Sequence, residues 1–253
     1  MNTRTEPDRP GQDEKASLLG ALRATDPSVR LRAAMSLGAI GGADVQVVEA
    51  LIECCAVEPD FFVRDMLTWA LCRQPADVTV PLLLAELDSG AEQAKSQALH
   101  TLSKIGDGRA WPRVATMLHD RANEVARAAW RAAVVLNPAV PNPAVPNPPV
   151  PNPAARNPTD SRSGATEVYS LAADLATELG RRDVESRRSL SRALVSLGGE
   201  CRAVVEQALS AADGSVRVHA AATIALFDDP DSAFDESVEQ ARRVAARGTD
   251  AHR

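Results

Sequence analysis

The side chains best able to do chemistry are few and scattered along this chain. Its four histidines (His100, His119, His219 and His252) lie in four separate segments, and the sequence contains neither an HExxH motif nor a His-Glu dipeptide. Zinc and iron sites need imidazole and carboxylate or thiolate ligands that converge on one point. The sequence therefore predicts no metal site.

The cysteines do not suggest a reactive centre either. Cys54 and Cys55 are adjacent, Cys72 and Cys201 stand alone, and no CxxC pair occurs. We expect them to be small apolar residues on amphipathic helices in a reducing compartment. The chain also lacks a GxSxG elbow, a P-loop and a dinucleotide fingerprint. It is predicted not to be an enzyme and to carry no cofactor.

A recurring arginine offers a different chemistry, the binding of anions. Arg30, Arg64 and Arg217 occupy equivalent places in a repeated pattern, with Lys95 as a variant. The net charge of −6 argues against an anion-binding strip. Residues 16–136 contain 12 basic and 14 acidic side chains, and residues 165–253 contain 11 basic and 15 acidic ones. Nucleic acids need a positive footprint, so no direct nucleic-acid binding is expected.

The elements that must position these side chains are predicted to be helices. Alanine is abundant and aromatic residues make up only 3% of the chain, which favours an all-α fold. One sequence core begins at Val29, Val63, Ala94 and Val125, at spacings of 34, 31 and 31 residues, and returns at Val216. Such a period is typical of stacked helix pairs. The predicted helices are 16–24, 28–39, 43–57, 61–73, 77–88, 91–105, 109–119, 122–136, 165–180, 184–198, 200–211, 214–227 and 232–247.

The first repeat shows the local signals most clearly. Asp26 is placed to cap a helix N-terminus and Pro27 to occupy its first turn. Val29, Ala33 and Leu37 fall at i, i+4 and i+8, which puts one apolar stripe on the face toward the paired helix.

The segment Asp26–Gly38, which reads Asp-Pro-x-Val-Arg-x-x-Ala-Ala-x-x-Leu-Gly, resembles a HEAT repeat of the E-Z type found in phycobilisome-lyase-like proteins. A degenerate copy ending in 196–198 matches 36–38. The resemblance implies an α-α superhelix, an armadillo-type HEAT-repeat solenoid that mostly binds proteins. It also implies a structural role for the arginine and for the aspartate four residues before it, in the pairs Asp26 and Arg30, Asp60 and Arg64, and Asp213 and Arg217.

A proline-rich segment interrupts the repeats. Residues 137–158 read NPAVP-NPAVP-NPPVP-NPAAR-NP and hold nine of the 17 prolines, so a polyproline II conformation is expected. We favour a spacer, and a ligand for SH3- or WW-type domains is the alternative. The predicted organisation is a disordered tail (1–15), a HEAT array (16–136), a linker (137–164), a C-terminal helical module (165–247) and a second disordered tail (248–253). Whether the module stacks on the array stays open.

Helical phase indicates a binding surface on the second helix of each pair. Positions opposite the apolar stripe should line an exposed ridge. The ridge is predicted to present, in order along the chain, Met35, Asp65, Trp69, His100, Arg127 and Arg131. Trp and Arg are frequent in interface hot spots, and Met adapts to varied partners. The alternative for Trp69 is packing between repeats.

The predicted function is a non-catalytic scaffold or adaptor that binds a protein partner along this ridge. Two alternatives remain: a regulatory module acting with a DNA-binding partner, as in MerR-like systems, or a bilin lyase- or isomerase-like enzyme, which the E-Z resemblance brings in. The first fifteen residues contain no apolar run, and no apolar stretch reaches 18 residues, so neither a signal peptide nor membrane insertion is expected. A cytoplasmic location is expected. The partner's identity and the oligomeric state stay open.

Overall fold

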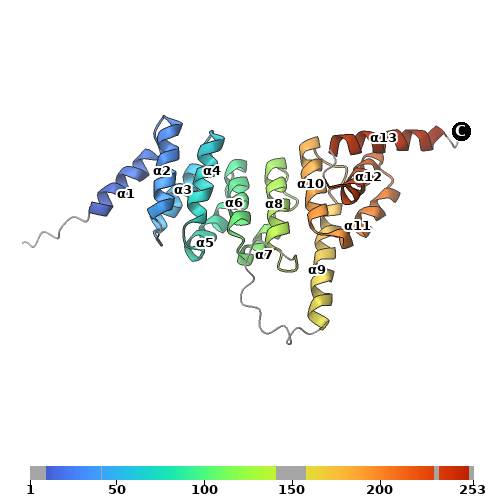
Figure 1. Cartoon of the computed structure of the whole chain (residues 1–253), viewed down its shortest axis with the longest axis horizontal. Helices are drawn as coiled ribbons and strands as arrows, with labels where there is room; N and C mark the ends of the chain where they lie inside the picture. Colours follow the sequence, from blue (N-terminus) through green and yellow to red (C-terminus); the bar gives the residue numbers. More distant parts are fainter. Residues whose placement is uncertain (1–9, 41, 141–157, 231–233, 251–253) are drawn as a thin grey trace, which may run out of the picture. The chain divides into compact units, whose positions relative to one another are not determined.

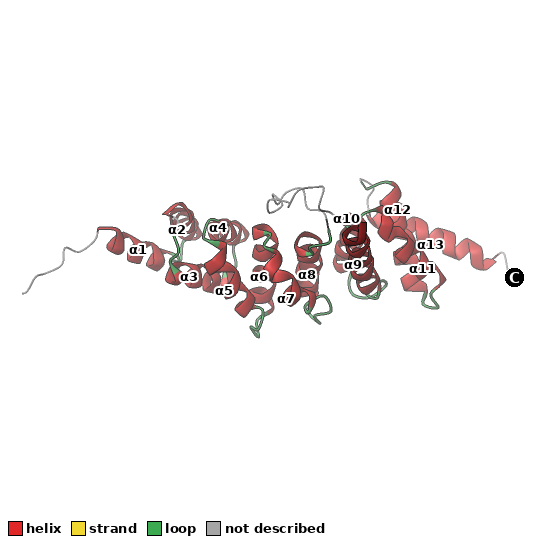
Figure 2. Ribbon diagram, turned by 90° about the horizontal axis from the view of Figure 1, so that it is seen from below, coloured by secondary structure: helices red, strands yellow, loops and turns green. Residues whose placement is uncertain are grey.

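The described chain is built from helices and turns. A computed structural model describes residues 10–40, 42–140, 158–230 and 234–250, and within these ranges it contains no strand (Figure 2). This confirms the predicted all-α fold. Polyproline II was expected over 137–158; residues 137–140 instead form a turn, in which the N–H of Val140 donates to the carbonyl of Asn137 at 3.0 Å, and 141–157 lie outside the described residues, as do parts of the two expected tails (1–9 and 251–253). None of the described helices is long and apolar enough to cross a bilayer.

The chain divides into two compact units between Asp107 and Gly108, and each is described by itself. Unit 1 contains three consecutive helix pairs (Figure 1). These are α1 (Pro10–Ala21) with α2 (Pro27–Ile40), α3 (Val45–Val57) with α4 (Phe61–Cys72), and α5 (Ala76–Glu86) with α6 (Glu92–Ile105). The second helices contact one another in sequence, α2 against α4 and α4 against α6, while α3 packs on α5 and α6.

Aspartate residues start several of these helices. The Asp44 carboxylate accepts hydrogen bonds from two backbone N–H groups in the first turn of α3, and Asp60 does the same for α4. Asp26 accepts from the N–H of Ser28 at 2.8 Å, and α2 begins at Pro27. These side chains satisfy N–H groups that have no partner inside the helix. The capping role predicted for Asp26 is confirmed.

The core of unit 1 follows the predicted stripe. Ala33 and Leu37 of α2 are each 2% exposed, and Val29 is half-buried. Small residues allow α2 to approach α4 closely. A Cβ built on Gly38 would lie 2.5 Å from Cζ3 of Trp69 and 2.9 Å from Cα of Ala70, so only glycine fits at this crossing.

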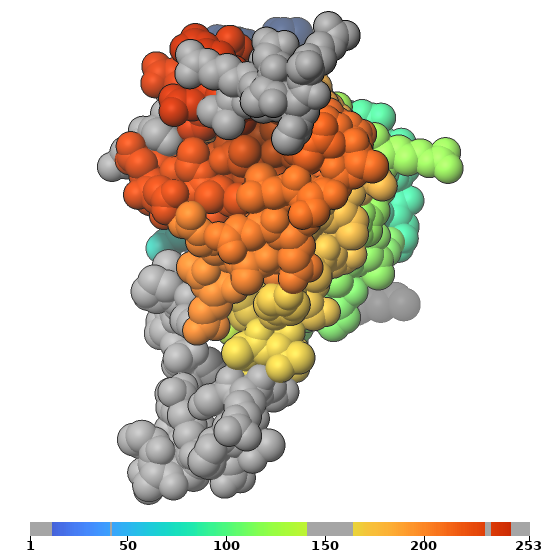
Figure 3. All heavy atoms as spheres, turned by 90° about the vertical axis from the view of Figure 1, so that its right-hand side faces the viewer, coloured from blue at the N-terminus to red at the C-terminus, as the bar shows by residue number. Residues whose placement is uncertain are grey.

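Unit 2 continues the succession of helix pairs. Its elements are η1 (Gly108–Ala110), α7 (Trp111–Ala115), α8 (Asn123–Leu136), α9 (Pro158–Ala176), α10 (Val184–Ser196), η3 (Gly199–Cys201), α11 (Arg202–Gln207), η4 (Ala208–Ser210), α12 (Gly214–Asp228) and α13 (Phe234–Asp250). Helix α8 packs on α10, α10 on α12 and α12 on α13. Figure 3 views the C-terminal end of this unit, where α9 emerges in yellow beneath the orange atoms of later helices.

Helices from both sides of the proline-rich segment pack together in unit 2. His119, which precedes α8, lies 2.8 Å from Glu178 and 3.0 Å from Asp174, both after the segment. Asn123 donates a hydrogen bond to Asp183 at 2.6 Å. The question that the sequence left open is thereby answered for α8 and α10. The helices after the proline-rich segment stack on the last helix pair before it, and the division between compact units falls earlier, after Asp107.

Several helix boundaries differ from the expected ones. Helix α1 begins at Pro10 and α9 at Pro158, inside segments expected to be tail and linker, and α13 extends to Asp250. Both early starts use a proline as the first helical residue. Proline is tolerated there because the missing N–H would have no intrahelical acceptor, so these prolines begin helices and do not exclude them.

Candidate functional site

In unit 1 the residues predicted to form the ridge lie on α2, α4 and α6. Met35 on α2 and Trp69 on α4 are 45% and 41% exposed, although both are large apolar side chains. Asp65 is also exposed, and His100 on α6 is half-buried. Because α2 contacts α4 and α4 contacts α6, the structure places these residues on neighbouring helices of one unit.

Trp69 has a structural contact as well as an exposed surface. Part of its ring packs against Gly38 of the preceding pair, which is the inter-repeat packing considered as the alternative. The guanidinium of Arg73 lies 5.9 Å from the ring centroid, a distance suited to a cation–π contact. Trp69 therefore joins two repeats and still presents part of its surface to a partner. Its role in docking stays a prediction.

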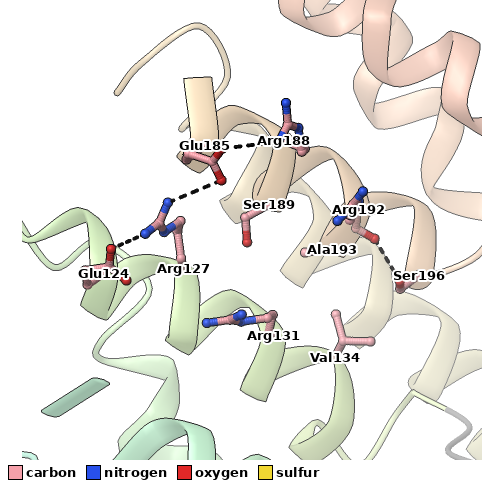
Figure 4. Close-up of a pocket in the computed structure, with 10 residues that line it drawn as sticks. All are labelled: Glu124, Arg127, Arg131, Val134, Glu185, Arg188, Ser189, Arg192, Ala193 and Ser196. Carbon is pink, nitrogen blue, oxygen red and sulfur yellow. Dashed lines mark hydrogen bonds and ion pairs between the residues drawn. The ribbon is translucent and has the colours of Figure 1, made fainter. Parts of the chain in front are cut away.

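Arg127 and Arg131, the remaining predicted ridge residues, lie in unit 2 and line a groove between α8 and α10. The groove has a volume of about 380 Å³ and is open to solvent (Figure 4). It is lined by Glu124, Arg127, Arg131, Val134, Glu185, Arg188, Ser189, Arg192, Ala193 and Ser196. Four of these ten side chains are arginines and two are glutamates, so the lining is positively charged at neutral pH.

The glutamates occupy one part of the groove and pair with two of the arginines. Arg127 pairs with Glu124 and lies 3.9 Å from Glu185, which also pairs with Arg188 at 3.2 Å. Figure 4 shows this chain of contacts running from α8 to α10. Arg188 also pairs with Asp235 of α13 at 2.6 Å. Arg127 and Arg188 are thus neutralised by carboxylates of this chain.

Arg131 and Arg192 are not paired in this way. Neither guanidinium has a carboxylate within ion-pair distance among the described residues, and neither carries a dashed line to an acid in Figure 4. The Arg131 side chain is exposed, and desolvation by neighbouring atoms, together with the positive charge of Arg127, lowers its pKa while Glu124 opposes this shift. An anion brought to this position would relieve both effects.

The predicted ridge ended at Arg131, so Arg188 and Arg192 on α10 were missed. Matching 196–198 to 36–38 displaces the ridge by three residues. The reliable marker is the N-cap, Asp183, whose carboxylate accepts from the N–H of Ser186. Arg192 follows this cap by nine residues, as Met35 and Trp69 follow theirs, and Arg188 follows it by five, as Asp65 follows Asp60. Counted from the caps, the ridge continues onto α10.

The recurring arginines have structural partners, but not the expected ones. Arg64 Nη1 donates to the backbone carbonyls of Glu58 and Pro59, both at 2.8 Å, and Arg217 Nη1 donates to those of Ala211 and Ala212, both at 2.7 Å. Arg30 makes the same pair of contacts with the carbonyls of 24 and 25. The aspartates Asp26, Asp60 and Asp213 instead cap the helices. Within each turn the aspartate accepts hydrogen bonds from backbone N–H groups and the arginine donates to backbone carbonyls, because a carboxylate can only accept and a guanidinium can only donate.

Arg30 has one further partner that the sequence pattern does not indicate. Its Nε and Nη2 donate to the two carboxylate oxygens of Glu58, both at 2.6 Å, and the Glu58 side chain is 4% exposed. The N–H of Asp60 also donates to Glu58 at 3.0 Å. These bonds hold the pKa of Glu58 below its usual range. The pair connects the first and second helix pairs of unit 1.

The histidines and cysteines have structural surroundings. His219 is 2% exposed, and burial lowers its pKa to about 4. Its Nδ1 accepts from the N–H of Gly180 at 2.9 Å, and its Nε2 lies 3.0 Å from Ser191 Oγ. Burial raises the pKa of all four cysteine thiols, that of Cys55 to about 12, so none is an activated nucleophile. Within the described residues no cluster of three or more His, Cys, Asp or Glu side chains is arranged to hold a metal.

A family model agrees with a helical repeat architecture for part of unit 1. A family model described as HEAT repeats matches residues 9–72. No curated protein matches the chain significantly. A designed armadillo repeat protein in complex with the peptide (KR)4 is 15% identical, with a TM-score of 0.43, over 85% of this chain and 99% of that one. Human deoxyhypusine hydroxylase is 20% identical, with a TM-score of 0.43, over 92% of this chain and 96% of that one.

The complex of CpcE and CpcF of phycocyanin lyase from Nostoc sp. PCC7120 is also similar. Its matched chain is 17% identical, with a TM-score of 0.35, over 95% of this chain and 96% of that one. All three TM-scores lie below 0.5, a range in which a likeness says nothing about function. The family match and the succession of helix pairs confirm the expected repeat architecture.

Proposed function

We propose that this HEAT-type repeat protein is a non-catalytic scaffold that binds a protein partner along the exposed ridge of its second helices. The observation that carries the proposal is the exposure of Met35 and Trp69 at equivalent positions of two adjacent helices. Full burial of such a side chain is worth about 1.5–3 kcal/mol, so a partner that covers both gains a substantial part of its binding energy here. Single exposed apolar residues are ordinary, whereas neighbouring ones on a shared surface favour an interface.

The chemistry of the ridge differs between the two units. Unit 1 presents a thioether and an indole, with the Asp65 carboxylate beside them, whereas unit 2 presents Arg127 and Arg131 at the same repeat positions. Trp, Met and Arg are enriched in protein interfaces. The ridge thus supplies apolar anchors in one unit and charged donors in the other. The weakly nucleophilic thiols agree with binding, and not with catalysis, as the activity.

Site-specific photocrosslinking of the full chain tests the proposal. A benzoylphenylalanine placed at Met35 should capture a partner protein, whereas the same group at Val57, which is 76% exposed on α3, should not. Met35 is preferred to Trp69 because Trp69 also packs on Gly38, so that its replacement would disturb the fold.

Affinity for the purified partner provides the second measurement. Met35→Glu should weaken binding by at least about tenfold, which corresponds to ~1.4 kcal/mol, and leave thermal unfolding unchanged. Val57→Glu serves as the matched control and should leave both unchanged. Equal crosslinking from positions 35 and 57, or full affinity in Met35→Glu, would contradict a docking role for the ridge.

A further inference from the structure

The groove between α8 and α10 contains more positive charge than this chain neutralises. Glu124 and Glu185 pair with Arg127 and Arg188, and Asp235 adds a second partner for Arg188. Arg131 and Arg192 line the same groove without a carboxylate partner among the described residues. The excess cationic groups therefore lie at the two positions nine residues after the N-caps of α8 and α10.

Arginine at such a place is suited to bind carboxylates. Its planar guanidinium donates two parallel hydrogen bonds to one carboxylate, and charge-assisted bonds of this kind are roughly twice as strong as neutral ones. Arg131 and Arg192 are both exposed, so the carboxylates of a partner can reach both guanidiniums. Binding an anion also offsets the repulsion between Arg131 and Arg127, which lie four residues apart on α8.

The arrangement of charges favours a short acidic segment over a polyanion. A nucleic-acid backbone laid along the groove would reach Glu124 and Glu185, whose charges repel phosphates. The chain as a whole carries a net charge of −6, which also opposes a long polyanion. An acidic peptide places its charges at chosen positions and avoids these two glutamates.

We propose that the groove binds an acidic segment of a partner protein, with its carboxylates on Arg131 and Arg192. The inference rests on the proposed protein-binding function and names the chemistry that unit 2 recognises. Acidic residues at alternate positions of an extended peptide project to one side about 6.6 Å apart. Adjacent packed helices lie about 8–10 Å apart, so the long arginine side chains of α8 and α10 can reach two such carboxylates.

Fluorescence anisotropy with a defined probe tests this inference on the full chain. The probe is a fluorescein-labelled octapeptide of alternating glutamate and alanine, and the same peptide with glutamine for glutamate is the control. The glutamate peptide should bind, and its affinity should fall as the salt concentration is raised. The glutamine peptide should not bind.

A matched pair of double variants locates the site. Arg131→Gln with Arg192→Gln should weaken binding of the glutamate peptide by at least about tenfold, the loss expected for two charge-assisted contacts. Arg242→Gln with Arg243→Gln removes the same charge from α13, where both arginines are exposed, and should change affinity less than about twofold. Among the described residues, neither Arg131 nor Arg192 has an ion-pair partner, so thermal unfolding of the first double variant should equal that of the wild type.

Three results would overturn the inference. One is the absence of binding of the glutamate peptide at about 1 mM and low salt, a limit that corresponds to ~4.1 kcal/mol of affinity. The second is equal weakening by the two double variants. The third is tighter binding of a single-stranded DNA 12-mer at the same arginines, which would make the groove a nucleic-acid site. If the peptide fails while a partner still crosslinks at Met35, this inference falls and the proposed function stands.

Discussion

Replacing Glu58 by glutamine removes one buried negative charge and keeps the size of the side chain. In the wild type, both carboxylate oxygens accept hydrogen bonds from Arg30 at 2.6 Å, and the two side chains are 4% and 13% exposed. Glutamine can accept at one oxygen only, and its NH2 group then faces the Arg30 guanidinium. The substitution therefore leaves a mostly buried cation without its counter-charge.

The expected cost follows from this burial. Removing one partner of a buried ion pair costs about 3–5 kcal/mol. Arg30 retains its two bonds to backbone carbonyls, and glutamine retains one acceptor, so we expect about 2–4 kcal/mol for Glu58→Gln. The nearby pair of Arg23 and Glu53 is the natural control, since it joins the same two helix pairs with side chains 73% and 67% exposed. Glu53→Gln should cost less than about 1 kcal/mol.

Urea unfolding followed by circular dichroism measures both variants. Amide hydrogen exchange of unit 1 peptides shows whether the loss is local to α2, α3 and α4. The pKa of Glu58 lies below its ordinary value of 4.5, so its contribution is present above that pH and is lost as the pH falls through the lowered pKa. The difference between wild type and Glu58→Gln should therefore shrink in acid. Equal destabilisation by the two variants at pH 7 would refute the reasoning.

Three other predictions concern contacts within single units. Hydrogen bonds to Glu178 first and then to Asp174 raise the pKa of His119, so the contribution of His119 to stability is full below about pH 6.5 and is lost as the pH rises through the raised pKa. The pH-dependent unfolding of His119→Gln should therefore differ from that of the wild type most below about pH 6.5. His219 is buried and neutral, with a pKa of about 4, so the free energy of unfolding should fall by about 3 kcal/mol as the pH falls from 6.5 to 4. An NMR titration should show its imidazole gaining a proton only near pH 4. Gly38→Ala should cost about 1–3 kcal/mol in thermal unfolding through a clash with Trp69, whereas Gly20→Ala, with open space around its Cβ, should stabilise α1 by up to ~1 kcal/mol.

The helix pairs could be predicted from sequence because their signals are local. An aspartate that caps the next helix, as Asp26 and Asp60 do, and an apolar stripe at i, i+4 and i+8 lie within about fifteen residues of one another. Repetition of the pattern then gives the register of each copy independently. The division after Asp107 has no such signal, since it depends on which helices pack together across the proline-rich segment.

The partners of charged side chains were harder to predict because they are distant in sequence. Glu58 pairs with Arg30 across 28 residues, and nothing in the repeat distinguishes it from an exposed glutamate such as Glu53. The arginine groove was missed for a related reason. Overall charge balance argued against an anion site, yet a site depends on which charges converge, and Glu124 and Glu185 neutralise only part of the lining.

Helix packing restricts the residue types at the buried positions of each repeat more than those at the exposed ridge positions. The residues at the stripe stay small or aliphatic from α2 to α12, because each must fit against a neighbouring helix. The residues nine positions after the N-cap change from Met35, Trp69 and His100 to Arg131 and Arg192, and Trp69 also packs on Gly38. A large apolar side chain in water and two unpaired arginines in one groove both carry a solvation or repulsion cost that a polar uncharged residue would avoid. We propose that a partner offsets that cost by covering the indole and the thioether of unit 1 and by supplying carboxylates to the groove of unit 2.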